Sequence, residues 1–567
     1  MSRLRPYLQA IAVAFALFLG IATAAGAATI VIVNNDGPGE GFNDPTPDPS
    51  FGGNPGTTLG EKRLFIFNYA ASIWGGILPS DVTIRVLAQF NSQTCDATSG
   101  VLGSAGARSA HANFPGAPFA NMYYHQALAN RLSGTDLSPT LEDINATFNS
   151  DVDNAVCLGD VSWYYGTDGQ DGADIELLPV VLHELGHGLG FSTFASSSTG
   201  AFLDGTPDIF AHFLLNTSTG LHWDQMTNNN ARKSSAVNTG NLVWDGPSVN
   251  LWAPTVLQHE PELLVLSPAT IDGSYVANLA GFGGSIDATG ITSGIVLVTD
   301  TVAPVNDGCE SFVNGPALAG KFALIDRGLC TFVAKVAAAQ ASGAIGVIVA
   351  NNVAGAPTTM GGTDPSITIP SIMISQADGT TIKNALLSGP VTATIRRHPT
   401  QLAGANSGGK VKMYAPNPVE PGSSVSHFDV SAFPDLLMEP GINSGLHDGV
   451  DLTRRLFEDI GWMPAITGVE PVVTAPKFRV RSAPNPFTPA TTILLALPTA
   501  GRTRVAVYDV QGRLVKRLLD SWMPAGTHGI AWDGSDEHGR RAAAGVYFSR
   551  VESNGRRAGE RLVKLER

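Results

Sequence analysis

Two histidines spaced one helical turn apart constrain this chain of 567 residues more than any other feature. They are His183 and His187 in the segment 178–191, which reads LPVVLHELGHGLGF. At about 100° per residue their side chains lie about 40° apart around a helix, so both imidazoles can reach one point. Pro179 suits the first turn, Gly190 suits the exit, and the aliphatic side chains fall on the other face. The segment therefore predicts a core helix that presents two imidazoles together.

The residues between the two histidines add a carboxylate. Glu184 follows His183 directly, which completes the pattern H-E-x-x-H. On a helix this pattern is typical of a zinc site, where the imidazoles bind the ion and the glutamate acts as general base. Three fixed positions also arise by chance in long chains, but a chance match seldom falls on an amphipathic helix that ends at a glycine. We predict that His183 and His187 bind Zn²⁺ and that Glu184 is the base.

A catalytic zinc site usually has three protein ligands, so one more is needed. The metzincin spacing would place it at Thr193, which is a poor zinc ligand. His427 is the favoured alternative because Met438 follows it by eleven residues, and a methionine in a turn beneath the zinc is a hallmark of metzincins. The remaining candidates are the leading substitute His212, the weaker Asp429, which could instead orient a ligand, and the histidines His222, His259, His398 and His447.

These two segments resemble the leishmanolysin-like zinc metallopeptidases, in which an insertion separates the third histidine from the helix. The resemblance covers about 175–195 and 420–462, and Phe428 stands where that family commonly has tryptophan. It implies a metzincin-like catalytic domain that hydrolyses peptide bonds. Residue by residue, it implies the zinc ligands His183, His187 and His427, the base Glu184 and the Met-turn residue Met438.

The stretch between the two catalytic segments has a different pattern. From about 294 it alternates strand, strand, helix and strand, which predicts a small α/β domain. It resembles the protease-associated (PA) domain family over about 266–398. The resemblance rests on GKFALIDRGLCTF at 320–332, AIGVIV at 344–349 and PSIMI at 370–374. It implies a non-catalytic module that guides substrates or partners.

The C-terminal stretch has short alternating strands separated by turn signals, which predict a small β-sandwich. It resembles the FlgD-type immunoglobulin-like and C-terminal sorting domains of secreted bacterial proteins. The matching residues are PNPF at 484–487, YD at 508–509, WDG at 532–534 and GVY at 545–547. The resemblance implies export sorting or retention at the cell surface.

The predicted fold class is therefore a multidomain α+β chain in which an α/β insert splits the catalytic domain and a β-sandwich follows. The boundaries that we predict are a signal peptide at 1–28, a catalytic domain at 29–265 and 399–462, a PA-like insert at 266–398, a linker at 463–477 and the sandwich at 478–567.

The N-terminus and the cysteines indicate an oxidising compartment. Arg3 and Arg5 precede an apolar run over 10–22 and a small-residue cleavage site, as in a secretory signal peptide. The run is shorter than the ~20 residues of a spanning helix, so we expect no stable membrane span. Four cysteines allow three pairings, and their neighbourhoods favour Cys95 with Cys157 and Cys309 with Cys330.

Charge and the remaining motifs exclude other functions. The formal net charge of -14 argues against nucleic acid as a partner, although residues 471–567 hold 16 basic and 8 acidic residues. The sequence holds no G-x-S-x-G nucleophile elbow, P-loop or dinucleotide fingerprint. Aspartates at 168, 171 and 174, and at 36, 44 and 48, suit either a Ca²⁺ site or capped turns, with turns favoured.

The sequence as a whole predicts a secreted or cell-surface zinc endopeptidase of bacterial type that acts on protein or peptide substrates. The alternative is a surface adhesin or binding protein with an inactive peptidase fold, which the intact His-Glu-His set disfavours. A further alternative is a processing peptidase whose PA domain selects its targets.

Overall fold

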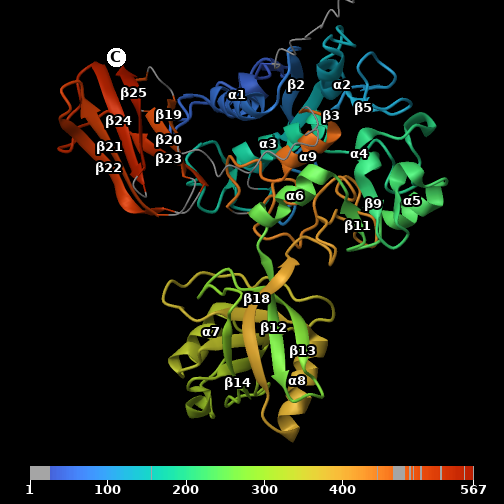
Figure 1. The fold of residues 1–567 in the computed structure, drawn as a ribbon, viewed down its shortest axis with the longest axis vertical. Helices are drawn as coiled ribbons and strands as arrows, with labels where there is room; N and C mark the ends of the chain where they lie inside the picture. Colours follow the sequence, from blue (N-terminus) through green and yellow to red (C-terminus); the bar gives the residue numbers. More distant parts are fainter. Residues whose placement is uncertain are drawn as a thin grey trace, which may run out of the picture. The chain divides into compact units, whose positions relative to one another are not determined.

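The computed structural model describes residues 26–463 apart from 155 and 444, and residues 479–565 apart from 484–486, 489–490, 498–500, 524–525 and 554–555. The predicted signal peptide and linker lie almost wholly outside the described residues. The chain divides into two compact units, Met1–Ala465 and Ile466–Arg567, which are described separately (Figure 1). Among the described residues no helix is long and apolar enough to cross a membrane.

A four-stranded sheet with the order β1-β2-β6-β3 forms the first layer of the larger unit. Strands β1, β2 and β6 are parallel, whereas β3 runs antiparallel along β6 and forms the edge. Helix α1 (Leu59–Ile77) lies near α3 (Leu177–Leu189), which runs beside β3. The strands are β1 (Ile30–Asn34), β2 (Ile84–Asn91), β3 (Gly103–Ala107) and β6 (Ile144–Asn149).

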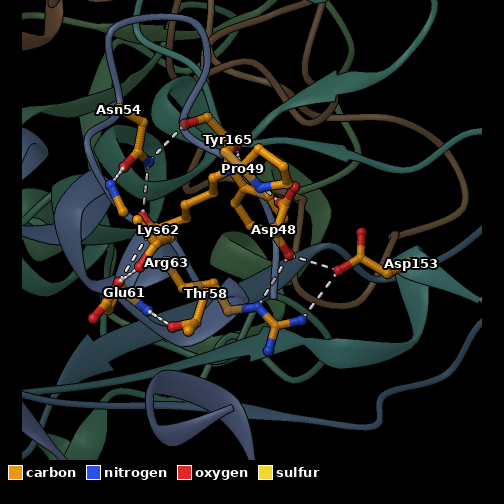
Figure 2. A network of polar contacts seen from close by, with 11 residues as sticks. Asp48, Pro49, Asn54, Thr58, Glu61, Lys62, Arg63, Asp153 and Tyr165 are labelled. Atoms are coloured by element: carbon orange, nitrogen blue, oxygen red, sulfur yellow. Dashed lines mark hydrogen bonds and ion pairs between the residues drawn. The ribbon is translucent and has the colours of Figure 1, made fainter. Parts of the chain in front are cut away.

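Two buried cations fix α1 to the loops around it (Figure 2). The Lys62 ammonium group lies 2.8 Å from the carboxylate of Asp48. Arg63 donates to the hydroxyl of Tyr165 at 3.0 Å and to the carboxylate of Asp153 at 3.1 Å. Farther along α1, the indole of Trp74 donates to the carbonyl of Leu182 in α3 at 3.1 Å. Because a buried charge is costly unless it is paired, these contacts set the position of α1 and, through Trp74, of α3.

Short elements complete this part of the unit. Residues before 258 and after 402 contribute to the same hydrophobic core, which includes Trp74, Leu185, Met438 and Trp462. The elements are β4 (Ala110–His111), β5 (Tyr124–His125), α2 (Gln126–Ser133), β7 (Trp163–Tyr164), β8 (Ile175–Glu176), α4 (Ile209–Phe213), β9 (Leu214–Asn216), β10 (Leu221–His222), α5 (Asn229–Ser235), β11 (Leu242–Trp244), α6 (Pro247–Val256) and α9 (Thr453–Ile460), with 3-10 turns at Gly41–Asn43, Ser150–Asp153, Leu203–Gly205 and Trp223–Gln225.

A closed barrel interrupts this part of the chain. Its strand order is β12-β13-β17-β16-β15-β14-β18. Helix α7 connects the parallel strands β15 and β16, and α8 leads from β17 to β18. The predicted insert of 266–398 falls inside it. The barrel closes because β12 and β18, at the two ends of the segment, pair with each other. Its elements are β12 (His259–Ser267), β13 (Gly273–Leu279), β14 (Ile291–Leu297), a 3-10 turn (Gly315–Leu318), β15 (Phe322–Asp326), α7 (Phe332–Ala341), β16 (Gly346–Ala350), β17 (Ser371–Ile374), α8 (Gln376–Ser388) and β18 (Thr392–Leu402).

Both predicted disulfides form. Cys95 is bonded to Cys157 in the first part of the larger unit, and Cys309 is bonded to Cys330 in the barrel. Near the first disulfide, the two-residue strand β7 pairs in parallel with β8.

The smaller unit is a two-sheet β-sandwich. One sheet has the order β19-β20-β23 and the other β22-β21-β24-β25. Phe487, Trp532 and Tyr547, three residues of the predicted motifs, pack in the core between them. The strands are β19 (Arg479–Ala483), β20 (Thr491–Leu497), β21 (Gly501–Asp509), β22 (Leu514–Met523), β23 (Gly526–Trp532), β24 (Gly545–Ser553) and β25 (Arg556–Lys564).

Candidate metal centre

Helix α3 carries the first two histidines. It begins after Glu176 and ends at Gly190, whose φ of 128° favours glycine, and all thirteen of its residues are buried. The indole of Trp462 donates to the carbonyl of Leu189 at 2.8 Å and anchors the last turn. His183 and His187 project from the same side of this helix, and their Nε2 atoms are 3.1 Å apart.

The third imidazole comes from a segment 240 residues farther along the chain. His427 Nε2 lies 3.2 Å from the Nε2 atoms of both His183 and His187. The amide of Phe428 donates to the carbonyl of Met438 at 2.8 Å, which ties the segment to the turn below α3. A Cβ on Gly186 would lie 2.9 Å from the Met438 sulfur, so the missing side chain at 186 lets the methionine pack directly under the helix.

Backbone carbonyls orient all three rings. The Nδ1 atoms of His183, His187 and His427 lie 2.7, 2.8 and 2.7 Å from the carbonyl oxygens of Leu437, Phe191 and Ser423. A carbonyl oxygen can only accept, so each neutral ring carries its proton on Nδ1 and points the lone pair of Nε2 inward. This arrangement of a metal-ligating histidine, with its other nitrogen donating to an acceptor, is the usual one in metal sites.

The three inward lone pairs fit a zinc ion. Nitrogens bound tetrahedrally at about 2.0–2.1 Å from zinc are about 3.3 Å apart, close to the observed separations of 3.1–3.2 Å. Burial lowers the pKa of His183 to about 3 and that of His187 to about 4, and it also lowers the pKa of His427. All three rings are therefore neutral at neutral pH. Without a cation between them, three acceptors would face one another with no donor.

Glu184 lies beside this cluster with 8% of its surface exposed. Burial raises the pKa of its carboxyl to about 8, and a hydrogen bond from the backbone of Ala105 acts in the opposite direction. Ala105 is in β3, and a Cβ on Gly103 of the same strand would lie 3.2 Å from Glu184 Cγ. The carboxyl thus sits between the imidazoles and the edge strand of the sheet.

The other ligand candidates lie outside the cluster. His212 pairs with Asp224 at 2.7 Å, and the hydroxyl of Thr193 donates to Asp208. Asp429 accepts from Ser431 and does not orient a histidine ring. The orienting groups are backbone carbonyls, which sequence reasoning did not identify, because a carbonyl partner can be supplied by any residue type.

The aspartates considered for a Ca²⁺ site form no cluster of potential metal ligands in the described part of the chain. Asp168 accepts from the hydroxyl of Tyr164 at 2.5 Å, and Asp174 accepts from the amide of Ser162. Asp48 instead pairs with Lys62. The acidic cluster that does form lies in the barrel, at Asp300, Asp307 and Glu310.

Two family models match parts of the chain. The PA domain matches residues 295–382, inside the barrel, and the FlgD Ig-like domain matches residues 489–556, inside the sandwich. The protein is therefore a multidomain α/β protein with a PA domain and a C-terminal Ig-like domain. The helix α3 and His427 lie outside both matches.

Known proteins are similar over short stretches. Leucine aminopeptidase 2 of Arthroderma otae is 40% identical over 100 residues, or 18% of this chain and 20% of its own length. The minor extracellular protease Vpr of Bacillus subtilis is 29% identical over 182 residues, or 32% of this chain and 22% of its own. The solved aminopeptidase from Aneurinibacillus sp. strain AM-1 has 26% identity, covers 24% of this chain and 30% of its own, and has a TM-score of 0.19. This chain thus spans about a fifth of the length of the curated relatives it matches.

Proposed function

We propose that this protein is a secreted zinc-dependent endopeptidase with a leishmanolysin-like metzincin catalytic domain that the PA domain splits. The convergence of three Nε2 lone pairs at 3.1–3.2 Å, each fixed by a carbonyl on the opposite ring nitrogen, carries the proposal. His183, His187 and His427 would hold the ion, and Met438 would pack beneath it. A bound zinc ion supplies a Lewis acid that polarises the scissile carbonyl and brings the pKa of water close to 7.

The position of Glu184 beside the imidazoles supports its role as the acid-base group. Its carboxyl takes a proton from the attacking water and gives it to the leaving nitrogen of the peptide. Burial raises the pKa of the Glu184 carboxyl, and a zinc ion bound beside it would favour the carboxylate form that accepts the proton in the first step. The chain therefore supplies both the ligands and a proton shuttle.

The edge strand supports cleavage within a chain. Among the described residues β3 pairs with β6 on one side only, and extended peptides can add to such an edge through main-chain hydrogen bonds. A substrate that binds as a strand extends past the site in both directions, so the enzyme has no need of a free amino terminus. Some PA-containing relatives are named aminopeptidases, but they match over only about a fifth of their length.

Replacing Glu184 with glutamine tests the assignment of the base. We expect E184Q to keep about one zinc per chain, measured by atomic emission, and to cleave casein about 10² to 10⁴ times more slowly. The matched control is E61Q, since Glu61 caps α1 on the surface. Full activity in E184Q would refute the role of Glu184.

A blocked peptide separates the two peptidase types. We expect a peptide with an acetylated N-terminus to be cut at internal bonds as fast as its free counterpart. Removal of single N-terminal residues from the free peptide only would instead assign an aminopeptidase. Absence of both zinc and cleavage would favour the binding-protein alternative.

The smaller unit supports a proposal about location. The FlgD Ig-like match and the basic composition of the C-terminal residues favour contact with the cell surface or the export machinery. We expect deletion of 466–567 to leave peptide cleavage unchanged and to shift the protein from the cell surface to the medium.

A further inference from the structure

The PA domain contains a second group of side chains that can hold a cation. Asp300 follows β14, and Asp307 and Glu310 lie in the loop after it. One carboxylate oxygen from each of the three lies within 4.8 Å of the other two. Asp300 is 3% exposed and Asp307 is 2% exposed, whereas Glu310 lies toward solvent.

Asp300 has an unsatisfied oxygen. Its Oδ2 accepts from the amide of Gly308 at 2.9 Å, but its Oδ1 is fully buried and has no hydrogen-bond partner. A buried carboxylate oxygen without a hydrogen-bond partner or a cation destabilises the fold. Native structures usually resolve such a group with a ligand, an ion or a water molecule. The orphaned oxygen therefore points to a bound group at this cluster.

The nearest basic side chain offsets the negative charge of the cluster only in part. Lys335 of α7 is buried, and its ammonium group donates to the main-chain carbonyl of Asp307. Within the described part of the barrel, no ion pair of 4.0 Å or less joins Lys335 to a carboxylate. Three carboxylates and one lysine leave a net negative charge at a place where Asp300, Asp307 and Lys335 are all buried.

The loop that carries the cluster is held in place. Cys309 lies between Asp307 and Glu310 in the sequence. Its disulfide bond to Cys330 ties the loop to the segment before α7. The amide of Asp300 donates to the carbonyl of Val305 at 2.8 Å, and the amide of Asp307 donates to the carbonyl of Pro304 at 3.2 Å. These contacts hold the carboxylates together before any ion binds, which reduces the entropic cost of binding.

We propose that Asp300, Asp307 and Glu310 bind a calcium ion in the PA domain, separate from the proposed zinc site. Hard carboxylate oxygens suit Ca²⁺, which accepts 6–8 oxygen ligands in irregular geometry. The solvent side at Glu310 leaves room for water to complete the coordination. Mg²⁺ is disfavoured because it demands near-octahedral geometry and is reluctant to lose its water.

Calcium titration of the full-length protein tests this site. The protein is stripped of metals, given one equivalent of zinc and titrated calorimetrically with CaCl₂. We expect wild type to bind one calcium ion more than D300N, with a Kd on the order of 10⁻⁴ to 10⁻³ M, as in extracellular modules. The control is D272N, because Asp272 is exposed in the same domain and outside the cluster, and it should titrate like wild type.

A second variant keeps the test decisive if D300N fails to fold. E310Q changes a side chain near solvent and should weaken calcium binding at least about tenfold while the fold stays intact. Calcium should also raise the unfolding temperature of wild type but not that of either variant. Equal calcium stoichiometry and affinity in wild type, D300N and E310Q would overturn the proposal and leave Lys335 as the group that offsets the charge.

Discussion

Within the larger unit, the proposed catalytic part (residues 26–258 and 403–463) and the PA barrel (residues 259–402) form their cores in different ways. The barrel core comes from one continuous stretch, whose two end strands pair to close it, as in Leu263 opposite Ile395. The catalytic core combines two stretches that the barrel separates, with Trp74 on one and Met438 on the other. The barrel core therefore needs only the strands of its own segment. The other core needs residues from both before and after the barrel.

This difference explains where the candidate metal centre lies. The amide of Ala403 donates to the carbonyl of Gln258 at 2.9 Å, so the chain leaves and re-enters the catalytic part at one place. The insert therefore need not disturb the fold on either side. His427 reaches His183 and His187 only because this crossing and the turn at Met438 position it.

Removing His427, the proposed zinc ligand that follows the barrel in sequence, should have the largest effect on zinc content and activity. We expect H427A to lose its zinc and to reduce kcat/KM at least about 10³-fold, because metal catalysis contributes several kcal/mol to the barrier. Zinc content and peptide hydrolysis measure this. H212A serves as the control, since His212 pairs with Asp224 away from the cluster. Loss of zinc in H212A with retention in H427A would reverse the ligand assignment.

Replacing one buried methionine in each core compares the two cores directly. Met438 lies under α3 and Met373 lies in the barrel, and both are fully buried. Each change to alanine should lower the free energy of unfolding of the larger unit by about 2–5 kcal/mol, measured by urea denaturation. Only M438A should also weaken zinc binding. Equal zinc affinities in both variants would show that the methionine beneath the site does not support the ligands.

Excision of the barrel tests whether the rest of the larger unit folds and acts without the insert. Joining Gln258 to Ala403 through a short Gly-Ser linker should leave hydrolysis of a small peptide nearly unchanged, because the two ends already lie together. A larger loss on a folded protein substrate would favour the selective role of the PA domain. Equal losses on both substrates would contradict both that role and the independence of the core.

The partly buried pair of His447 and Glu176, at the start of α3, gives the smallest expected effect. The hydrogen bond to Glu176 raises the pKa of His447 above its usual value. Because the folded state binds this proton more tightly, the pair stabilises the protein below pH 6.5, and the contribution disappears as pH rises through the raised pKa.

The expected size of this contribution is about 1 kcal/mol or less, since the pair is partly exposed. The stability difference between wild type and H447Q should therefore be fully present below pH 6.5 and decrease as the pH rises above that value. A difference that does not change as the pH rises, or that survives in the E176Q background, would contradict the linkage.

Helix α3 could largely be predicted from the sequence, because the spacing of His183 and His187 and the helix end at Gly190 are local features. His427 and Met438 were predicted through family resemblance, since no local pattern brings together side chains 240 residues apart. The closure of the barrel was not predicted, because the pairing of β12 with β18 is nonlocal.

The acidic cluster of the barrel could not be predicted from the sequence for the same reason, because it depends on the folded loop. The Asp-rich loop at 168–174 attracted attention by composition, yet its carboxylates serve local hydrogen bonds. Asp300 and Asp307 are seven residues apart without a known motif, and only the folded loop brings them to Glu310.

Anomalous diffraction at the zinc absorption edge tests the central claim most directly. Crystals of the full-length protein should show one strong peak equidistant from the Nε2 atoms of His183, His187 and His427, at about 2.0–2.1 Å from each. A zinc peak at another set of ligands, or full peptidase activity in a protein with no peak at this site, would contradict the account.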